Sequence, residues 1–149
     1  MIKTNYILTE VLTQALEKMA FLTVGPVDEE MTVPDQTVLA QMSFTGPKNG
    51  TIQILAGTEF AELLARNIGA LDQADEENGY DALKELCNVT CGLLLPAMAC
   101  SQKDVFDVTV PKVEPSGKAP KWEQFIEQPD CIVSNVEGYA VASRLIMKD

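Results

Sequence analysis

The sequence contains no histidine. This absence removes the side chain that most often serves as a general base near neutral pH, and it also removes the commonest nitrogen ligand of zinc. Any catalysis must therefore use carboxylates, amides, thiols or groups donated by a partner. No apolar run approaches the roughly 20 residues needed to cross a bilayer, and the start of the chain lacks the layout of a secretory signal peptide. We expect a cytoplasmic protein that does not span a membrane.

Positive charge is also scarce. Lys and Arg number 11 against 22 Asp and Glu, which gives a formal net charge of -11. Such a chain repels phosphate backbones and anionic lipid surfaces, so neither nucleic acid nor a membrane is expected as a partner. A length of 149 residues allows a hydrophobic core without a disulfide or a metal, and it predicts a single domain over residues 1–149.

The four cysteines form no CxxC pair. Cys87 and Cys91 lie four residues apart, which on a helix places them on neighbouring turns. Buried free thiols that act as small apolar side chains are the favoured interpretation in a reducing cytosol. A thiol or metal protein built on Cys87, Cys91 and Cys100 is the alternative. We expect this chain to bind no metal.

Hydrophobic periodicity predicts helices and strands in turn. Apolar residues recur at three- and four-residue steps over residues 7–23, which indicates an amphipathic helix ended by Gly25 and Pro26. Residues 37–44 and 51–55 are rich in strand formers and flank a turn. They predict a β-hairpin.

Two further helices are expected before the remaining strands. Thr58 is positioned to cap a helix over residues 59–68, and Gly69 lies where that helix would stop. A third helix is predicted over residues 80–95, with Pro96 disrupting or ending it. The segments that follow predict strands at residues 105–113, 131–136 and 139–147, with a loop at 114–120. The order of helix, hairpin, two helices and strands predicts the α+β class, a β-sheet with packed helices.

The helix predicted at residues 80–95 separates two kinds of side chain. On a wheel of about 100° per residue, one side gathers Leu83, Leu86, Cys87, Thr90 and Leu94. The opposite side gathers Asp81, Glu85, Asn88 and Gly92. Glycine costs roughly 1 kcal/mol relative to alanine inside a helix, and asparagine is a poor helix former. One explanation is tight packing at Gly92 and a solvated Asn88; the other is that Gly92 lets a partner approach the amide of Asn88.

The same residues resemble the motif of the CheC, CheX and FliY phosphatases. That motif reads Asp or Ser, three residues, Glu, two residues, Asn, twenty-two residues and Pro. Asp81, Glu85, Asn88 and Pro111 fit it without a gap. A Glu and an Asn at this spacing occur often by chance, whereas the distant proline makes the match specific. The order of the predicted elements also resembles that of CheX.

This resemblance implies a phosphatase that removes phosphate from a phosphorylated response regulator of the CheY type. Asn88 would orient a water for in-line attack on the aspartyl phosphate, and Glu85 would pair with a lysine in the partner's active site. The partner would provide the acceptor aspartate and the Mg²⁺, so this chain would bind no cofactor of its own. Asp81 and Pro111 would shape the site. The alternative is a non-catalytic module that binds a response regulator or another signalling partner without turnover.

The resemblance also bears on the number of sites. CheC carries two copies of the motif on two related helices. When residues 13–20 are set beside residues 81–88, Glu17 falls under Glu85, but Ala20 stands where Asn88 would be. Since alanine cannot hold a water, we expect one site per chain, as in CheX. The resemblance to CheX further implies a homodimer.

Overall fold

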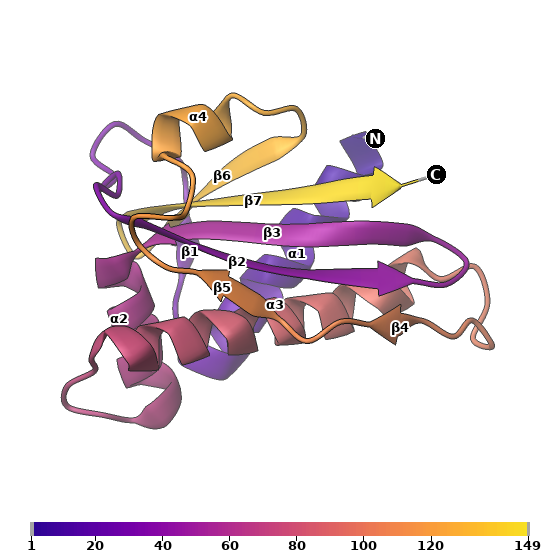
Figure 1. Ribbon diagram of the computed structural model, residues 1–149, viewed down its shortest axis with the longest axis horizontal. Coiled ribbons are helices and arrows are strands. Elements are labelled where there is room, and N and C mark those ends of the chain that lie inside the picture. The colour runs from indigo at the N-terminus through magenta and orange to yellow at the C-terminus, as the bar shows by residue number, and fades with distance from the viewer. Residues whose placement is uncertain (1, 149) are drawn as a thin grey trace.

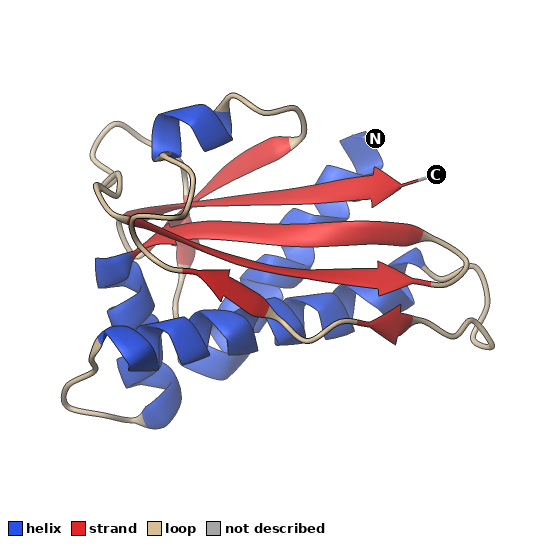
Figure 2. Ribbon diagram, in the orientation of Figure 1, coloured by secondary structure: helices blue, strands red, loops and turns tan. Residues whose placement is uncertain are grey.

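The computed structural model describes residues 2–148, with side chains described from residue 6 onward. Figures 1 and 2 show a strongly twisted sheet with helices packed against it. The helices are α1 (Ile2–Ala20), α2 (Thr58–Gly69), α3 (Glu76–Met98) and α4 (Trp122–Ile126). The strands are β1 (Val24–Gly25), β2 (Thr37–Thr45), β3 (Asn49–Gly57), β4 (Asp107–Val108), β5 (Lys112–Glu114), β6 (Cys131–Val136) and β7 (Tyr139–Lys148).

The strands form a single antiparallel sheet. Their order is β1-β6-β7-β3-β2-β4, and β5 also pairs with β2. The long strands β3, β2 and β7 make its centre, while β4 and β5 together form the edge beyond β2. Figure 1 shows the segment that carries β5 and β4 running alongside α3, and β5 contacts that helix. This edge of the sheet and α3 are therefore neighbours.

Helices α1, α2 and α3 pack on one face of the sheet, and the short helix α4 packs on the other face. The larger core cluster joins α1, α2 and α3 to the sheet and includes Leu12, Phe44 and Leu86. The smaller cluster lies under α4, where Trp122 and Phe125 pack on Leu39, Leu55, Ala140 and Ala142. Because successive side chains of a strand point to opposite faces, β2 serves both clusters. None of the helices in the described part of the chain is long and apolar enough to cross a membrane.

The predicted α+β class and order of elements are confirmed, with shifted helix ends. The first helix stops at Ala20, before the expected Gly25 and Pro26. Phe21 adopts a left-handed φ of 56°, and the N–H of Leu22 turns back to donate to the carbonyl of Leu16 at 3.2 Å. A left-handed residue of this kind ends a helix, although a non-glycine residue rarely takes the conformation.

The predicted cap of α2 is wrong. Gly57 is the N-cap residue and Thr58 is the first residue of the helix, so the Thr58 side chain caps nothing there. Gly69 is the last helical residue, and the left-handed position that follows it is Ala70, with φ 52°. The third helix also runs further than expected, because it continues past Pro96 to Met98.

The strand predicted at residues 105–113 is split by a bulge that contains Pro111. Phe44 of β2 faces Val108, and Gln41 of β2 faces Lys112. Between these pairs β2 has two residues, 42 and 43, whereas the edge strand has three, 109 to 111. A proline has no N–H for the ladder, so bulges and edge strands are where sheets accept it. The short strand β1 and the short helix α4 were not predicted from the sequence.

Candidate functional site

The motif lies on α3, whose first turn is fixed by a reciprocal cap. The Asp75 side chain accepts a hydrogen bond from the N–H of Asn78 at 2.8 Å, and the Asn78 side chain accepts one from the N–H of Asp75 at 3.0 Å. Glu76 and Glu77 add negative charge in the first turn, where the helix dipole favours it. This pattern explains why the helix begins at Glu76 rather than at the predicted residue 80.

The two predicted faces of α3 are confirmed. The apolar face is buried against the core through Leu83, Leu86, Cys87, Thr90 and Leu94. The opposite face is exposed at all four predicted positions, namely Asp81, Glu85, Asn88 and Gly92. The helix thus presents a carboxylate and a carboxamide, one turn apart, to the outside of the molecule.

Two glycines in α3 have different surroundings. A Cβ at Gly79 would lie 3.0 Å from the Cβ of Ala61, so close packing against α2 requires glycine there. A Cβ at Gly92 would meet nothing within 4 Å. Packing inside this chain therefore does not explain Gly92, which contradicts the tight-packing part of the first explanation, whereas Asn88 is exposed to solvent as that explanation expected. In addition, Pro96 has no N–H to donate to the Gly92 carbonyl four residues earlier.

Two hollows flank Asn88 along the exposed face. The first lies between α2 and α3, has a volume of about 210 Å³, and has Asp81 and Glu85 at its rim. The second, of about 660 Å³, lies at the far end of α3 and is lined by Gly92, Leu95 and Phe106 among others. On α3, Asn88 thus lies between the residues that line the first hollow and those that line the second.

Pro111, the fifth predicted residue, comes from a different element. It is half-buried in the bulge between β4 and β5, on the segment that runs alongside α3. The Thr109 side chain accepts a hydrogen bond from the N–H of Ser43 at 2.9 Å, and the Thr109 N–H donates to the Ser43 carbonyl at 2.9 Å. Pro111 therefore shapes the sheet edge, while the other four residues share one helix face.

The second copy of the motif, tested on the first helix, has no usable geometry. Glu17 is exposed, but Ala20 is fully buried in the core. The position that would have to hold an amide in α1 thus faces inward. This supports the expectation of one site per chain.

The cysteine alternative loses support. Cys87 and Cys91 are buried, and burial raises the pKa of Cys87 to about 12 and the pKa of Cys91 to about 11. A thiol with so high a pKa holds almost no thiolate near neutral pH, so it is a poor nucleophile and a poor metal ligand. Cys100 is exposed, and within residues 2–148 no three Cys, Asp or Glu side chains lie close enough to share a metal ion.

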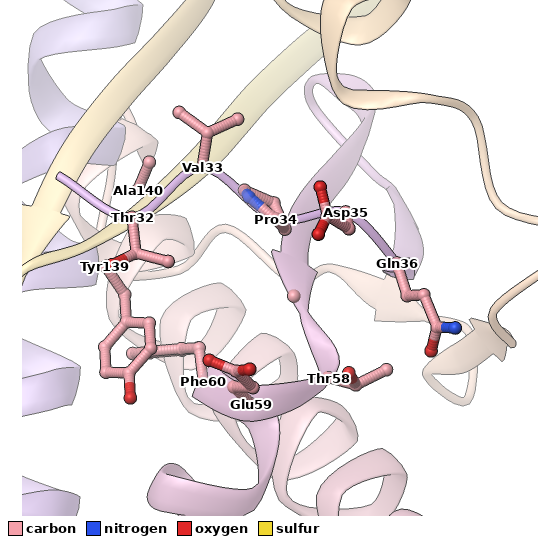
Figure 3. Close-up of a pocket in the computed structure, with 11 residues that line it drawn as sticks. Thr32, Val33, Pro34, Asp35, Gln36, Thr58, Glu59, Phe60, Tyr139 and Ala140 are labelled. Atoms are coloured by element: carbon pink, nitrogen blue, oxygen red, sulfur yellow. The ribbon is translucent and has the colours of Figure 1, made fainter.

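A further pocket of about 240 Å³ lies away from this face (Figure 3). It is bordered by residues 32–36, by the start of α2 and by Tyr139, whose ring lies 6.0 Å from that of Phe60. Its charged groups, Asp35 and Glu59, are both acidic. None of the five motif residues lines it.

Fold and site together define an α+β protein that carries its candidate chemistry on an exposed helix rather than in a deep cleft. The model of one protein family, described as chemotaxis phosphatase CheX, matches residues 38–120. That span is more than half of the chain and contains Asp81, Glu85, Asn88, Gly92 and Pro111. The chain belongs to the CheX family. A comparison with curated proteins gives no match.

Solved structures of chemotaxis proteins share the fold over nearly the whole chain. CheX from Desulfovibrio desulfuricans is 16% identical, with a TM-score of 0.73 and coverage of 98% of this chain and 99% of that one. CheX from Vibrio vulnificus is 19% identical, with a TM-score of 0.68 and coverage of 95% and 93%. The CheX–CheY–BeF3–Mg complex from Borrelia burgdorferi contains a chain 16% identical, with a TM-score of 0.63 and coverage of 97% of both chains. These likenesses concern the fold.

Proposed function

We propose that this protein accelerates hydrolysis of the aspartyl phosphate of a CheY-type response regulator. The observation that carries the proposal is the exposure of Glu85 and Asn88 on one face of α3, beside the open position Gly92. Membership of the CheX family supports it, and so does the existence of a CheX–CheY complex from Borrelia burgdorferi.

The proposed chemistry divides between the two proteins. Asn88 holds a water through the donor and acceptor of its amide plane. The water oxygen forms a bond to phosphorus as the bond to the aspartate oxygen breaks, and the products are a free carboxylate and inorganic phosphate, which takes up the water proton. Phosphoryl transfer asks a protein mainly for positioning and charge stabilisation. No histidine base is then required, which fits the composition of the chain.

Docking is assigned to the other motif residues. Glu85 pairs with a lysine in the active site of the regulator and thereby fixes Asn88 over the phosphoryl group. Gly92 leaves clearance for the surface of the regulator, and Asp81 and Pro111 shape the surroundings. The Mg²⁺ belongs to the regulator, so this chain contributes no metal ligand. The cytoplasm, where response regulators work, remains the expected location.

A homodimer remains part of the proposal. The edge formed by β4 and β5 leaves one side of its backbone unpaired within the described chain, and Val108 and Val110 are exposed along it. Exposed edges of this kind pair readily with another strand unless they are covered or interrupted. Sedimentation of the purified protein at several concentrations measures the oligomeric state directly.

The decisive assay is phosphate release from a phosphorylated CheY-type regulator in the presence of Mg²⁺. The proposal predicts faster release with the protein than the regulator shows alone. Binding to the phosphorylated regulator without any acceleration would instead identify a non-catalytic docking module. The same assay, repeated with each regulator of the organism, identifies the substrate.

A further inference from the structure

The hollow between α2 and α3 has an unusual lining. Its floor is apolar and its rim is acidic. The lining residues are Ala65, Ile68, Gly69, Leu71, Asn78, Asp81, Ala82 and Glu85. Since Glu85 also belongs to the motif, the hollow is continuous with the proposed docking face.

Leu71 is the most exposed apolar residue of this lining, with 45% of its surface accessible. It follows the left-handed Ala70, and its N–H donates to the carbonyl of Arg66 at 2.9 Å, which holds it at the end of α2. A Cβ at Gly69 would lie only 3.1 Å from Cγ of Leu71, so the glycine leaves room for this leucine. The chain thus holds an apolar side chain in place without covering it.

The acidic rim has no ion-paired partner within the described part of the chain. Among the described residues, no Lys or Arg forms an ion pair with Asp81 or Glu85. The carboxylates therefore present unpaired negative charge next to an apolar floor. The complementary group is a cation on an aliphatic stem, because lysine and arginine lay their methylenes on apolar surface while the charged head reaches polar partners.

We propose that this hollow receives a second basic side chain of the response regulator, one that lies outside its phosphorylation pocket. The stem rests on Leu71 and Ile68, and the cationic head pairs with Asp81. This inference rests on the proposed function, and it adds a contact that sets affinity rather than chemistry. An apolar side chain fits the observations less well, because it would remove water from Asp81 without offering that carboxylate a partner.

Two substitutions separate the apolar and charged parts of the contact. In the phosphate-release assay, Leu71→Ala is expected to raise KM about tenfold, because truncation removes buried methylenes from the docked complex. Asp81→Asn is expected to raise KM about fivefold at low salt and to lessen its salt dependence, since an exposed ion pair is weak and screened. Leu71→Ala should leave kcat unchanged, because Leu71 lies outside the motif. Val27→Ala and Asp72→Asn, both exposed and outside the hollow, are the matched controls.

The outcomes are distinct. Unchanged KM in both variants would overturn the inference. A raised KM in Leu71→Ala with an unchanged salt dependence in Asp81→Asn would point to an apolar side chain and also overturn it. Calorimetry with the regulator activated by beryllofluoride gives the affinities without turnover. The docking subsite is therefore tested even if phosphate release proves not to depend on Asn88, a result that would count against the proposed function alone.

Discussion

At the scale of single residues, the proposed site depends on a solvent-exposed amide and a solvent-exposed carboxylate. Glu85 and Asn88 are exposed. The position one turn beyond Asn88 is Gly92, which has no side chain, and the space that a Cβ would occupy there is empty. An amide on a rigid helix loses little further conformational entropy when the complex forms and positions the water. Positioning of reactants lowers the barrier through this saving in entropy. A residue of this kind is inactive until a partner arrives.

The first prediction concerns Glu85. Glu85→Gln keeps the size of the side chain and removes its charge, so it should raise KM for the phosphorylated regulator about tenfold while kcat falls less. Steady-state dephosphorylation at several regulator concentrations separates the two constants. Equal losses in kcat and kcat/KM, with KM unchanged, would show that Glu85 takes part in the chemical step instead.

The second prediction compares the two glycines of α3. Gly92→Ala should leave the free energy of unfolding unchanged or raise it by up to about 1 kcal/mol, because a helix prefers alanine and the new methyl meets nothing. It should nevertheless weaken regulator binding. Gly79→Ala should lower the free energy of unfolding, because its Cβ would press on Ala61. Chemical denaturation and calorimetry measure both effects, and unimpaired binding by Gly92→Ala would contradict the role given to this glycine.

At the scale of elements, α3 is the platform of the site. Its buried side anchors it between α1, α2 and the sheet, and its reciprocal cap fixes where it begins. The edge segment with the Pro111 bulge lies along its flank. The motif proline and the helix are therefore linked through packing, although 22 residues separate Asn88 from Pro111.

The third prediction tests the start of this platform. Asp75→Ala removes the side chain that accepts the Asn78 N–H, and it should lower the free energy of unfolding by about 1 kcal/mol. Because Asp75 is remote from Asn88 along the helix, kcat should stay close to the wild-type value under conditions where the protein is folded. Thermal or urea denaturation measures the first effect. A stability unchanged within error would mean that the cap contributes nothing.

Periodicity predicted the elements that bury a continuous apolar face. The faces of α3 could be derived in this way, because its buried residues recur at three- and four-residue steps. The strands β6 and β7 do not alternate regularly between buried and exposed residues, and four successive residues of β7 are buried. The short helix α4 escaped notice, since five residues carry no period. The hollow beside Leu71 also could not be foreseen, because it exists only once α2 and α3 pack together.

At the scale of the whole molecule, the burial of two thiols makes the free energy of unfolding depend on pH in the alkaline range. Burial raises the pKa of Cys87 from 9.0 to about 12 and that of Cys91 from 9.0 to about 11. The folded state keeps these protons while the unfolded chain releases them near pH 9. The stabilisation is therefore complete below about pH 9 and is lost as the pH rises through about 12.

The fourth prediction follows from this sign. The free energy of unfolding should fall between about pH 9 and about pH 12, and Cys87→Ala should make that fall shallower. Urea denaturation at a series of pH values measures the slope for both proteins. Parallel curves would show that Cys87 does not contribute to the alkaline instability.

A thiol reagent at neutral pH should react with the exposed Cys100 faster than with Cys87 or Cys91.

The proposed function depends on Asn88, and phosphate release by Asn88→Ala tests it most directly. Loss of a group that positions the attacking water should lower kcat by on the order of 100-fold or more. Because the side chain is exposed, the unfolding midpoint and the affinity for a beryllofluoride-activated regulator should change little. A folded Asn88→Ala protein that releases phosphate at the wild-type rate would contradict the central claim.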